Sequence, residues 1–243
     1  MLEDILNYER SAFLWMNNGH SAFGDQFMWL FSGKIGWIPL AVAYIIILSY
    51  KNKTNWKEVI LVFASIVFVI TLCDQFSSSI CKPLFTRFRP THHPDFMDVV
   101  NIVFDYRGGP YGFISSHAAN AFGFATLTSL IFRYRPYLLM LFGWAIVTAY
   151  SRIYLGVHFI TDVIPGIISG ILFGWIVYEL YIIARKKIIV GKNQNTNIDN
   201  NFNPFTFNGI DIILYLLILT IAVMAIISLL YTLHIIPAIS IKI

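Results

Sequence analysis

Charged residues are scarce in this 243-residue chain. Asp, Glu, Lys and Arg make up 12% of it, about half of the roughly 25% found in soluble domains, whereas hydrophobic residues reach 57% and the mean hydropathy is +0.68. So few charged side chains cannot cover a water-exposed surface. The composition therefore excludes an ordinary soluble domain and predicts an integral membrane protein.

Basic tracts, a signal peptide and a disulfide are also missing. No run of Lys or Arg is present and the formal net charge is only +4, so nucleic acid is not expected as a partner. The first residues, "MLEDILNYER", are acidic where a secretory signal is basic, and we expect residue 1 to remain in the mature chain. Cys73 and Cys81 lie eight positions apart in one apolar segment, about 12 Å along a helix, which is too far for a disulfide.

Apolar stretches of about 20 residues, the length of a membrane-spanning helix, recur along the chain. Six spans are predicted, at 28–50, 59–81, 113–132, 137–155, 161–183 and 211–233. The third and fourth have short apolar runs, for which a re-entrant pair is the alternative. Residues 1–26 mix apolar and polar positions and predict an interfacial helix. The expected fold is all-α: a polytopic membrane bundle of about six transmembrane helices, forming one domain over residues 1–243.

Two features of the fifth span and the loop after it bear on packing. Gly166, Gly170 and Gly174 recur every four residues and share one helix face, which predicts close approach of a neighbouring helix. Residues 184–209 are first basic and then rich in Asn without helical periodicity, which predicts a mobile loop.

The distribution of positive charge favours one orientation. The loops after the first, third and fifth spans hold nine of the 17 Lys and Arg residues, against eight elsewhere. Three of these eight, Lys82, Arg89 and Arg152, lie in the polar motifs described next. Without them the count is nine Lys and Arg residues on one side against five on the other. The positive-inside tendency then predicts that these three loops are cytoplasmic and that the motifs face outwards, in a bacterial inner membrane.

Polar residues gather in three segments on this outer side, each at a span end: "KPLFTRFRP" (82–90), "GFISSHA" (112–118) and "SRIYLGVHFITD" (151–162). Lys82, Arg89 and Arg152 would concentrate positive charge in a partly desolvated pocket, and guanidinium groups match phosphate oxygens in pairs. We therefore predict an anion site, with Arg87 as an interfacial cation beside it. In the second span, the polar stripe that contains Asp74 runs towards Lys82 and predicts interhelical hydrogen bonds that position it, with direct catalysis by Asp74 as the alternative.

The same segments contain groups suited to phosphoryl transfer. Ser115 and Ser116 precede the third helix, where free backbone N–H groups favour a phosphate. His158 and Asp162 are four residues apart, so on a helical turn the carboxylate can orient the imidazole as a nucleophile. His117 is a second imidazole, suited to protonating a leaving group. Together they predict a covalent phosphohistidine.

The three segments resemble the signature of the type 2 phosphatidic acid phosphatase family: K-x6-R-P, then P-S-G-H, then S-R-x5-H-x3-D. The matching positions are Lys82, Arg89, Pro90, Ser115, His117, Ser151, Arg152, His158 and Asp162. Ile114 stands where the family usually has Pro, and Ser116 where it usually has Gly. The substituted Ser adds a side chain near the phosphate, and its hydroxyl offers a hydrogen bond in place of close backbone approach.

The resemblance implies metal-independent hydrolysis of a lipid phosphate or pyrophosphate, without a cofactor. It implies His158 as nucleophile, Asp162 as its orienting group and His117 as general acid. The phosphate would be held by Lys82, Arg89, Ser115 and Arg152, with Ser116 beside them. No metal site is expected, because the His and Asp residues of segment 92–98 fit a solvated loop.

Several substrates and two other functions are compatible with these motifs. Undecaprenyl pyrophosphate is the first choice, because two spans precede the first motif as in that subgroup, and lipid A phosphate follows closely. Phosphatidylglycerol phosphate and phosphatidic acid are alternatives. A vanadate-dependent haloperoxidase would share the anion site but is soluble, and an anion channel would not need paired His and Asp residues. The expected partners are a lipid phosphate and the bilayer, and the sequence sets no oligomeric state.

Overall fold

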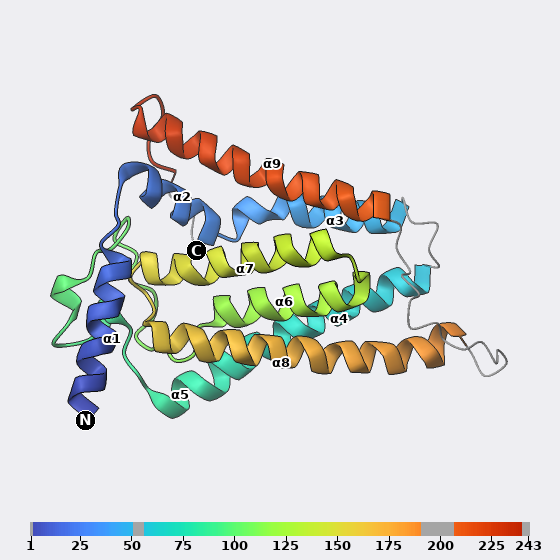
Figure 1. Cartoon of the computed structure of the whole chain (residues 1–243), viewed down its shortest axis with the longest axis horizontal. Helices are drawn as coiled ribbons and strands as arrows, with labels where there is room; N and C mark the ends of the chain where they lie inside the picture. The colour runs from blue at the N-terminus through green and yellow to red at the C-terminus, as the bar shows by residue number, and fades with distance from the viewer. Residues whose placement is uncertain (1, 51–55, 191–206, 240–243) are drawn as a thin grey trace.

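The computed structural model describes residues 2–50, 56–190 and 207–239. Within these ranges the regular elements are helices, with one isolated β-bridge between Phe88 and Tyr111. Six long helices run side by side (Figure 1): α3 (Ile38–Tyr50), α4 (Trp56–Gln75), α6 (Ser116–Phe132), α7 (Arg135–Tyr154), α8 (Ile160–Arg185) and α9 (Phe207–Thr232). The predicted all-α bundle is confirmed.

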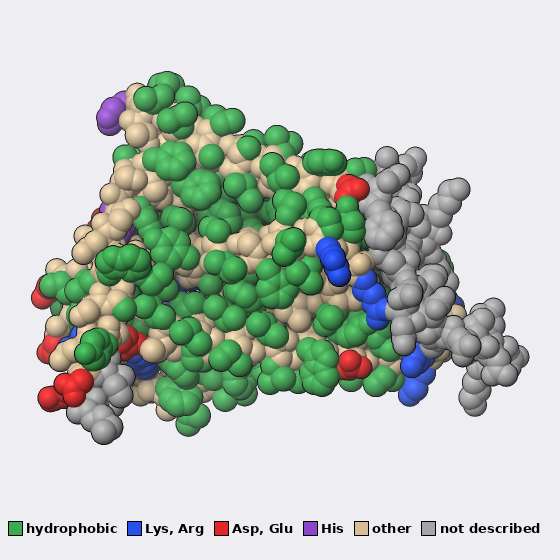
Figure 2. Space-filling view, in the orientation of Figure 1, with side chains coloured by type: hydrophobic (Ala, Val, Ile, Leu, Met, Phe, Trp, Pro, Cys, Tyr) green, Lys and Arg blue, Asp and Glu red, His purple; other side chains and the backbone are tan. Residues whose placement is uncertain are grey.

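In the described part of the chain, four helical stretches are long and apolar enough to cross a membrane, and a fifth span results if the bent pair of α2 and α3 counts as one. They are Trp56–Phe85, Arg135–Tyr154, Ile160–Ile189 and Gly209–Thr232. The remaining predicted span, 113–132, is α6, which has only 17 residues and lies at the centre of the bundle. Figure 2 shows an apolar belt along the bundle with charged side chains at its two ends, as expected for an integral membrane protein.

The first predicted span, 28–50, is not one straight helix. Helix α2 (Ala22–Ser32) and the segment Ile35–Ser49 meet at a bend of 69°. Gly33 ends α2 in an extended conformation, and its N–H donates to the carbonyls of Trp29 and Leu30. A 3-10 turn, Ile35–Trp37, then leads into α3. A hydropathy pattern cannot show this break, because both arms are apolar.

Helix α4 continues through a π-helical turn, Phe76–Cys81, into the short helix α5 (Lys82–Phe85). The helical path ends at Thr86, which adopts a left-handed conformation with φ 42°. A π turn rotates the residues that follow it relative to an ideal α-helix, and such turns are frequent at functional sites. Here the turn sets the direction of Lys82 at the end of the second span.

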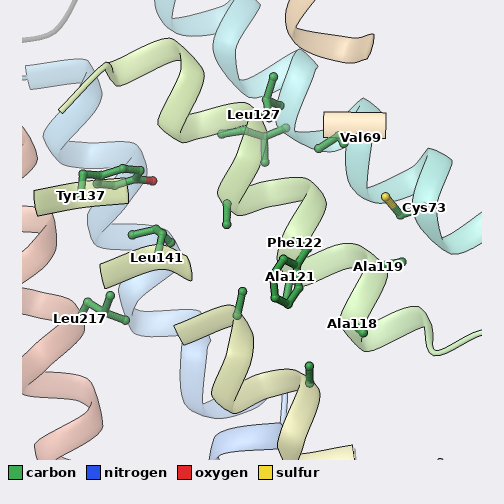
Figure 3. Packing of buried hydrophobic residues seen from close by; sticks show 14 of the residues in the cluster. Val69, Cys73, Ala118, Ala119, Ala121, Phe122, Leu127, Tyr137, Leu141 and Leu217 are labelled. Carbon is green, nitrogen blue, oxygen red and sulfur yellow. The ribbon is translucent and has the colours of Figure 1, made fainter. Parts of the chain in front are cut away.

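Helices α6 and α8 pack closely through the glycine face predicted from the sequence. A Cβ on Gly166 would lie 2.8 Å from the carbonyl oxygen of Ser115, and one on Gly174 would lie 2.7 Å from that of Gly123. Small residues also line α6, among them Ala118, Ala119 and Ala121 (Figure 3), and a Cβ on Gly166 of α8 would lie 3.2 Å from the Cβ of Ala118. Close packing is confirmed, and it brings the start of α6 beside the start of α8.

Helix α1 (Leu2–Asn17) lies across one end of the bundle, in keeping with an interfacial helix (Figure 1). Short 3-10 turns at Pro90–His92 and Met97–Val99 occupy the loop at the same end. At the opposite end, α8 continues as a π-helical turn, Lys186–Val190, so helix replaces the first part of the loop predicted at 184–209. Residues 191–206 of that loop lie outside the described part of the chain.

Candidate active site

The three polar segments meet at one end of the bundle, beside α1. The first segment forms α5 and the loop that follows it. The second leads into the start of α6, and the third joins the end of α7 to the start of α8. Four of the predicted site residues are almost fully buried there: Ser115, Arg152, His158 and Asp162 are at most 1% exposed. Burial of two charged groups and an imidazole needs specific polar partners, and the fold supplies partners for most of their polar atoms.

His158 and Asp162 form a contact across the N-terminus of α8. The imidazole Nδ1 lies 3.6 Å from the carboxylate Oδ2. Asp162 is the third residue of α8, and its Oδ2 accepts a hydrogen bond of 2.9 Å from the backbone N–H of Phe159. The sequence predicted two residues on one helical turn, but His158 precedes the helix, so the pair instead forms at its start. The carboxylate thereby caps the helix while it faces the imidazole.

The partner of the other imidazole nitrogen indicates the tautomer. Nε2 of His158 lies 3.1 Å from a terminal nitrogen of Arg89, and a guanidinium group can only donate. Nε2 therefore accepts, and the proton of the neutral ring lies on Nδ1, towards Asp162. Burial lowers the pKa of His158 well below its usual range, and the charges of Arg89 and Arg152 lower it further. A neutral imidazole whose Nε2 carries a lone pair and no proton is the form that a nucleophile requires.

The predicted cations surround this histidine. Lys82 Nζ donates to the Ser116 hydroxyl at 2.8 Å, and the Ser77 hydroxyl also donates to Ser116 at 2.6 Å. The hydroxyl that replaces the usual Gly of the second motif thus holds Lys82 in place. Ser77, a member of the polar stripe of the second span, shares the Ser116 hydroxyl with Lys82, which is an interhelical hydrogen bond of the kind predicted. Asp74 of the same stripe lines the cavity described below.

Arg89 and Arg152 are fixed by groups from several elements. Arg89 donates to the carbonyls of Tyr111 and Val157, both at 3.2 Å. Burial and the charge of Arg152 lower the pKa of Arg89 to about 10, so it stays charged at neutral pH. Arg152 donates to the hydroxyl of Ser32 and, at 3.2 Å, to that of Tyr106.

One donor of Arg152 has no partner. Among the described residues, its buried Nε–H makes no hydrogen bond. A buried donor left unpaired is costly, so this N–H is a candidate contact for a phosphate oxygen.

The start of α6 contributes backbone groups as well as side chains. Ser115 is the N-cap: its hydroxyl accepts from the N–H of Ala118 at 3.5 Å, and its own N–H donates to the carbonyl of Asp162 at 3.0 Å. The first N–H groups inside the helix then point towards the site, with the favourable end of the helix dipole. His117 lies in this first turn, and its buried Nε2 makes no hydrogen bond within the described ranges.

Arg87, predicted to be an interfacial cation, instead belongs to the site. Its NH1 donates to Asp162 Oδ1 at 2.7 Å, and its NH2 donates to both oxygens of Glu9 at 2.8 and 2.7 Å. The position of Arg87 inside the first motif was a signal in its favour. Glu9 had no such signal, because its distance in sequence from the motifs is bridged only by the fold.

Ser32, Tyr106 and Gly112 were also not predicted. Ser32 and Tyr106 hold Arg152, as described above. Gly112 leaves room for the histidine and carboxylate, since a Cβ there would lie 3.0 Å from Asp162 Oδ2 and 3.5 Å from His158 Nδ1. The two histidines of segment 92–98 bind elsewhere: His92 contacts Thr91, and His93 contacts Arg10 and the N–H of Asp95.

An apolar cavity of about 490 Å³ adjoins the site between α2, α3, α4, α6, α7 and α9. Its polar end is formed by Lys34, Asp74, Ser116, His117 and Asn120. Along α7 it reaches from Thr148 to Tyr137, about 16 Å at 1.5 Å per residue.

The cavity opens towards the apolar belt. Its lining includes Ile45 of α3 and Ile70 of α4, which are 49% and 38% exposed. Both side chains have accessible surface, so the cavity is not sealed where these two helices line it. The cavity thus joins the polar site to the surface that faces the hydrocarbon of the membrane.

Comparison with known proteins gives consistent results. The PAP2 superfamily model matches residues 58–186. The chain is 45% identical over 186 residues to a lipid A 4'-phosphatase of Porphyromonas gingivalis, covering 76% of this chain and 78% of that protein. It is 37% identical over 187 residues to a lipid A 4'-phosphatase of Bacteroides thetaiotaomicron, covering 76% and 81%.

Two solved structures are similar in fold. LpxE of Aquifex aeolicus has a TM-score of 0.50 and 27% identity, covering 70% of this chain and 93% of that one. The PAP2 type phosphatidylglycerolphosphate phosphatase of Bacillus subtilis has a TM-score of 0.56 and 18% identity, covering 76% and 89%. The second likeness concerns the fold alone.

Proposed function

The chain belongs to the PAP2 superfamily and is a membrane lipid phosphatase, and from this premise we propose that its substrate is lipid A, from which it removes the 4'-phosphate. The observation that carries the proposal is the 45% identity to a lipid A 4'-phosphatase over three quarters of both chains. The same comparison favours lipid A phosphate over undecaprenyl pyrophosphate, the first choice from sequence.

In the proposed reaction His158 attacks first. Its Nε2 lone pair forms a bond to phosphorus while the bond from phosphorus to the sugar oxygen breaks. Because Nε2 accepts from Arg89 at 3.1 Å, substrate binding must draw this guanidinium onto a phosphate oxygen. Asp162 faces the Nδ1 proton and stabilises the positive charge that develops on the ring.

His117 acts first as a general acid towards the leaving group and then as a general base towards water. It gives a proton to the departing sugar oxygen, and the negative charge of the bound phosphate offsets the surrounding cations that would otherwise oppose its protonation. Water next attacks the phosphohistidine, the P–N bond breaks, and His117 takes up the proton of the water. The products are inorganic phosphate and the dephosphorylated lipid, with both histidines restored.

The cations bind the phosphate in both steps. Lys82, Arg89 and Arg152 converge on His158, and the unpaired Nε–H of Arg152 is available to an equatorial oxygen. The backbone N–H groups at the start of α6 add further donors. Such donors stabilise the charge that builds up on phosphorus in the transition state.

The apolar cavity offers a place for a lipid tail. It connects the polar site at His117 to the apolar belt, so an acyl chain can enter between α3 and α4 while the phosphate reaches His158. Its volume of about 490 Å³ lies within the roughly 300–1,000 Å³ range of ligand pockets. Following the charge bias of the loops, we place this end of the bundle on the outer face of a bacterial inner membrane.

Substrate choice is tested with the purified protein in detergent, in the presence of EDTA. We expect kcat/KM for phosphate release to be highest for bisphosphorylated lipid A, with the 4'-phosphate removed and the 1-phosphate retained in the mass spectrum of the product. Undecaprenyl pyrophosphate, phosphatidylglycerol phosphate and phosphatidic acid are the comparison substrates. Faster hydrolysis of any of these three, or loss of the 1-phosphate, would contradict the proposal.

Filling the cavity separates lipid binding from chemistry. Ala41→Trp places an indole in the cavity on α3, which carries none of the site residues. We expect KM for lipid A to rise about tenfold or more, the effect of two lost buried methylenes at about 0.8 kcal/mol each. Turnover of 4-nitrophenyl phosphate, which has no tail, should stay as in the wild type.

Ala222→Trp is the matched control for this change. It adds the same side chain at an exposed position of α9 outside the cavity, and KM for both substrates should stay unchanged. Equal KM for lipid A in Ala41→Trp and the wild type would exclude the cavity as the tail site.

A further inference from the structure

Helix α1 is fixed against the active site by specific contacts. The ring of Phe13 is fully buried and packs edge-on against Phe159, the residue next to His158, with 5.3 Å between ring centres. The amide of Asn17 donates to the carbonyls of Ile153 and Tyr154 at 3.2 and 2.9 Å. Helix α1 lies outside residues 58–186, the part that matches the family model. Its contribution to the site is therefore an addition to the matched segment.

Glu9 is the residue of α1 that reaches the catalytic groups. Its side chain is only 8% exposed, and both carboxylate oxygens accept from Arg87. The Thr161 hydroxyl donates to the same carboxylate. One terminal nitrogen of Arg87 thus serves both carboxylate oxygens, and because Glu9 is largely buried this ion pair is stronger than a solvent-exposed one.

Arg87 connects Glu9 to Asp162. One terminal nitrogen binds Glu9 and the other binds Asp162 Oδ1 at 2.7 Å, while the guanidinium lies over the ring of Phe159, 4.9 Å from its centre. Asp162 then presents its second oxygen to His158. The side chains thus form a line in which the charge alternates, from Glu9 through Arg87 to Asp162 and finally to the imidazole.

The alternation matters because Asp162 must act on His158 as a negative group. Arg87 alone would cancel the field of Asp162 at the imidazole and would pull the carboxylate towards itself. Glu9 neutralises Arg87, so the trio keeps one net negative charge next to His158. Electrostatic effects of this kind are large in a buried site, where the effective dielectric constant is low.

We propose that Glu9 and Arg87 are positioning residues that hold Asp162 in place and set the basicity of His158. The proposal rests on the role of His158 in the proposed function. It makes the N-terminal interfacial helix a functional part of the active site, through one carboxylate that the motifs do not contain.

Other charged groups also act on the imidazole and must stay constant in a test. Those around His158 come from α5, α6, α7 and the loop after α5, and they are Lys82, His117, Arg152 and Arg89. None of them contacts Glu9 among the hydrogen bonds and ion pairs of the described residues. A change at Glu9 therefore alters the line through Arg87 without removing a phosphate ligand.

The test uses the pH dependence of kcat/KM for 4-nitrophenyl phosphate, whose acid limb reports protonation of His158 in the free enzyme. Glu9→Gln removes a negative charge, so the limb should move to lower pH. Arg87→Gln removes a positive charge, so the limb should move to higher pH. Each shift should be on the order of half a pH unit, as expected for one charge acting through an intervening group. The double variant should return towards the wild-type position.

The rate should change as well. We expect kcat of Glu9→Gln to fall about threefold, the equivalent of the half-unit change in the pKa of His158, with KM within about twofold of the wild type. Glu3→Gln is the matched control, because Glu3 is an exposed carboxylate on the same helix, and it should leave both the rate and the pH profile unchanged. If Glu9→Gln does not fold, Glu9→Ala, which removes the same negative charge, gives a second reading of the same shift.

The outcomes separate this proposal from the proposed function. Opposite shifts for the two single variants support it, because a purely structural role of α1 predicts no such opposition. Equal pH profiles for Glu9→Gln and Glu3→Gln would overturn the role of Glu9. An inactive His158→Asn in the same experiment would leave the histidine chemistry of the proposed function standing. A His158→Asn variant that still turns over would instead contradict the histidine chemistry itself.

Discussion

His158→Asn is expected to lower turnover by on the order of 10⁴-fold or more, because the chemistry then loses its nucleophile. The wild type should acquire labelled phosphate during rapid quench with labelled substrate. This label should survive alkali and be lost in mild acid, as expected of a P–N bond to histidine. The variant should show neither product nor label, since Asn can occupy the position of the ring but cannot attack phosphorus.

His234→Asn is the matched control for this substitution. His234 is exposed at the end of α9 and has φ 57°, a conformation that Asn tolerates well. It should retain both activity and label. An active wild type without any acid-labile phosphate, together with a His158→Asn variant that still turns over, would indicate direct attack by water.

Arg152→Lys is expected to lower kcat by roughly 10²–10³-fold, the usual cost of removing one preorganised donor to the transition state. Lysine keeps the positive charge but cannot bind the hydroxyls of Ser32 and Tyr106 and present a third N–H to the phosphate. Vanadate, which mimics the five-coordinate phosphorus, should inhibit the variant less strongly than the wild type. Both effects are measured in detergent with 4-nitrophenyl phosphate.

Arg135→Lys tests whether any such loss reflects a general intolerance of lysine. Arg135 is exposed at the first residue of α7, at the opposite end of the bundle. Its replacement should leave kcat and vanadate inhibition unchanged. If Arg152→Lys retains near-normal activity, Arg152 serves packing and the other two cations hold the phosphate.

The place of Arg87 shows why some site residues cannot be assigned from sequence. An arginine at a span end looks the same whether its head group lies in the membrane interface or in a buried ion pair. What decides is the location of Glu9 and Asp162, which lie 78 and 75 residues away along the chain. Only the packing of α1 against the start of α8 brings these three side chains together.

The sequence by itself determined the membrane class, the approximate spans, the family and the set of candidate catalytic residues. Span length depends on a local property, the run of apolar residues, and motifs keep their spacing because each segment is one short local structure. For the same reason the glycine face of α8 was predictable from four-residue spacing alone. These features need no knowledge of which helices are neighbours.

The tertiary structure alone decided the 69° bend after Ser32, the anchoring of Arg152 by Ser32 and Tyr106, the cavity between six helices and the line from Glu9 to Asp162. Each depends on contacts between segments that are distant in sequence. The side chains in such contacts depend on the partners that they touch in the folded protein. The residues next to them in the sequence do not indicate which partners these are. In this protein, distant contacts place the phosphate ligands and set the charge next to the nucleophile.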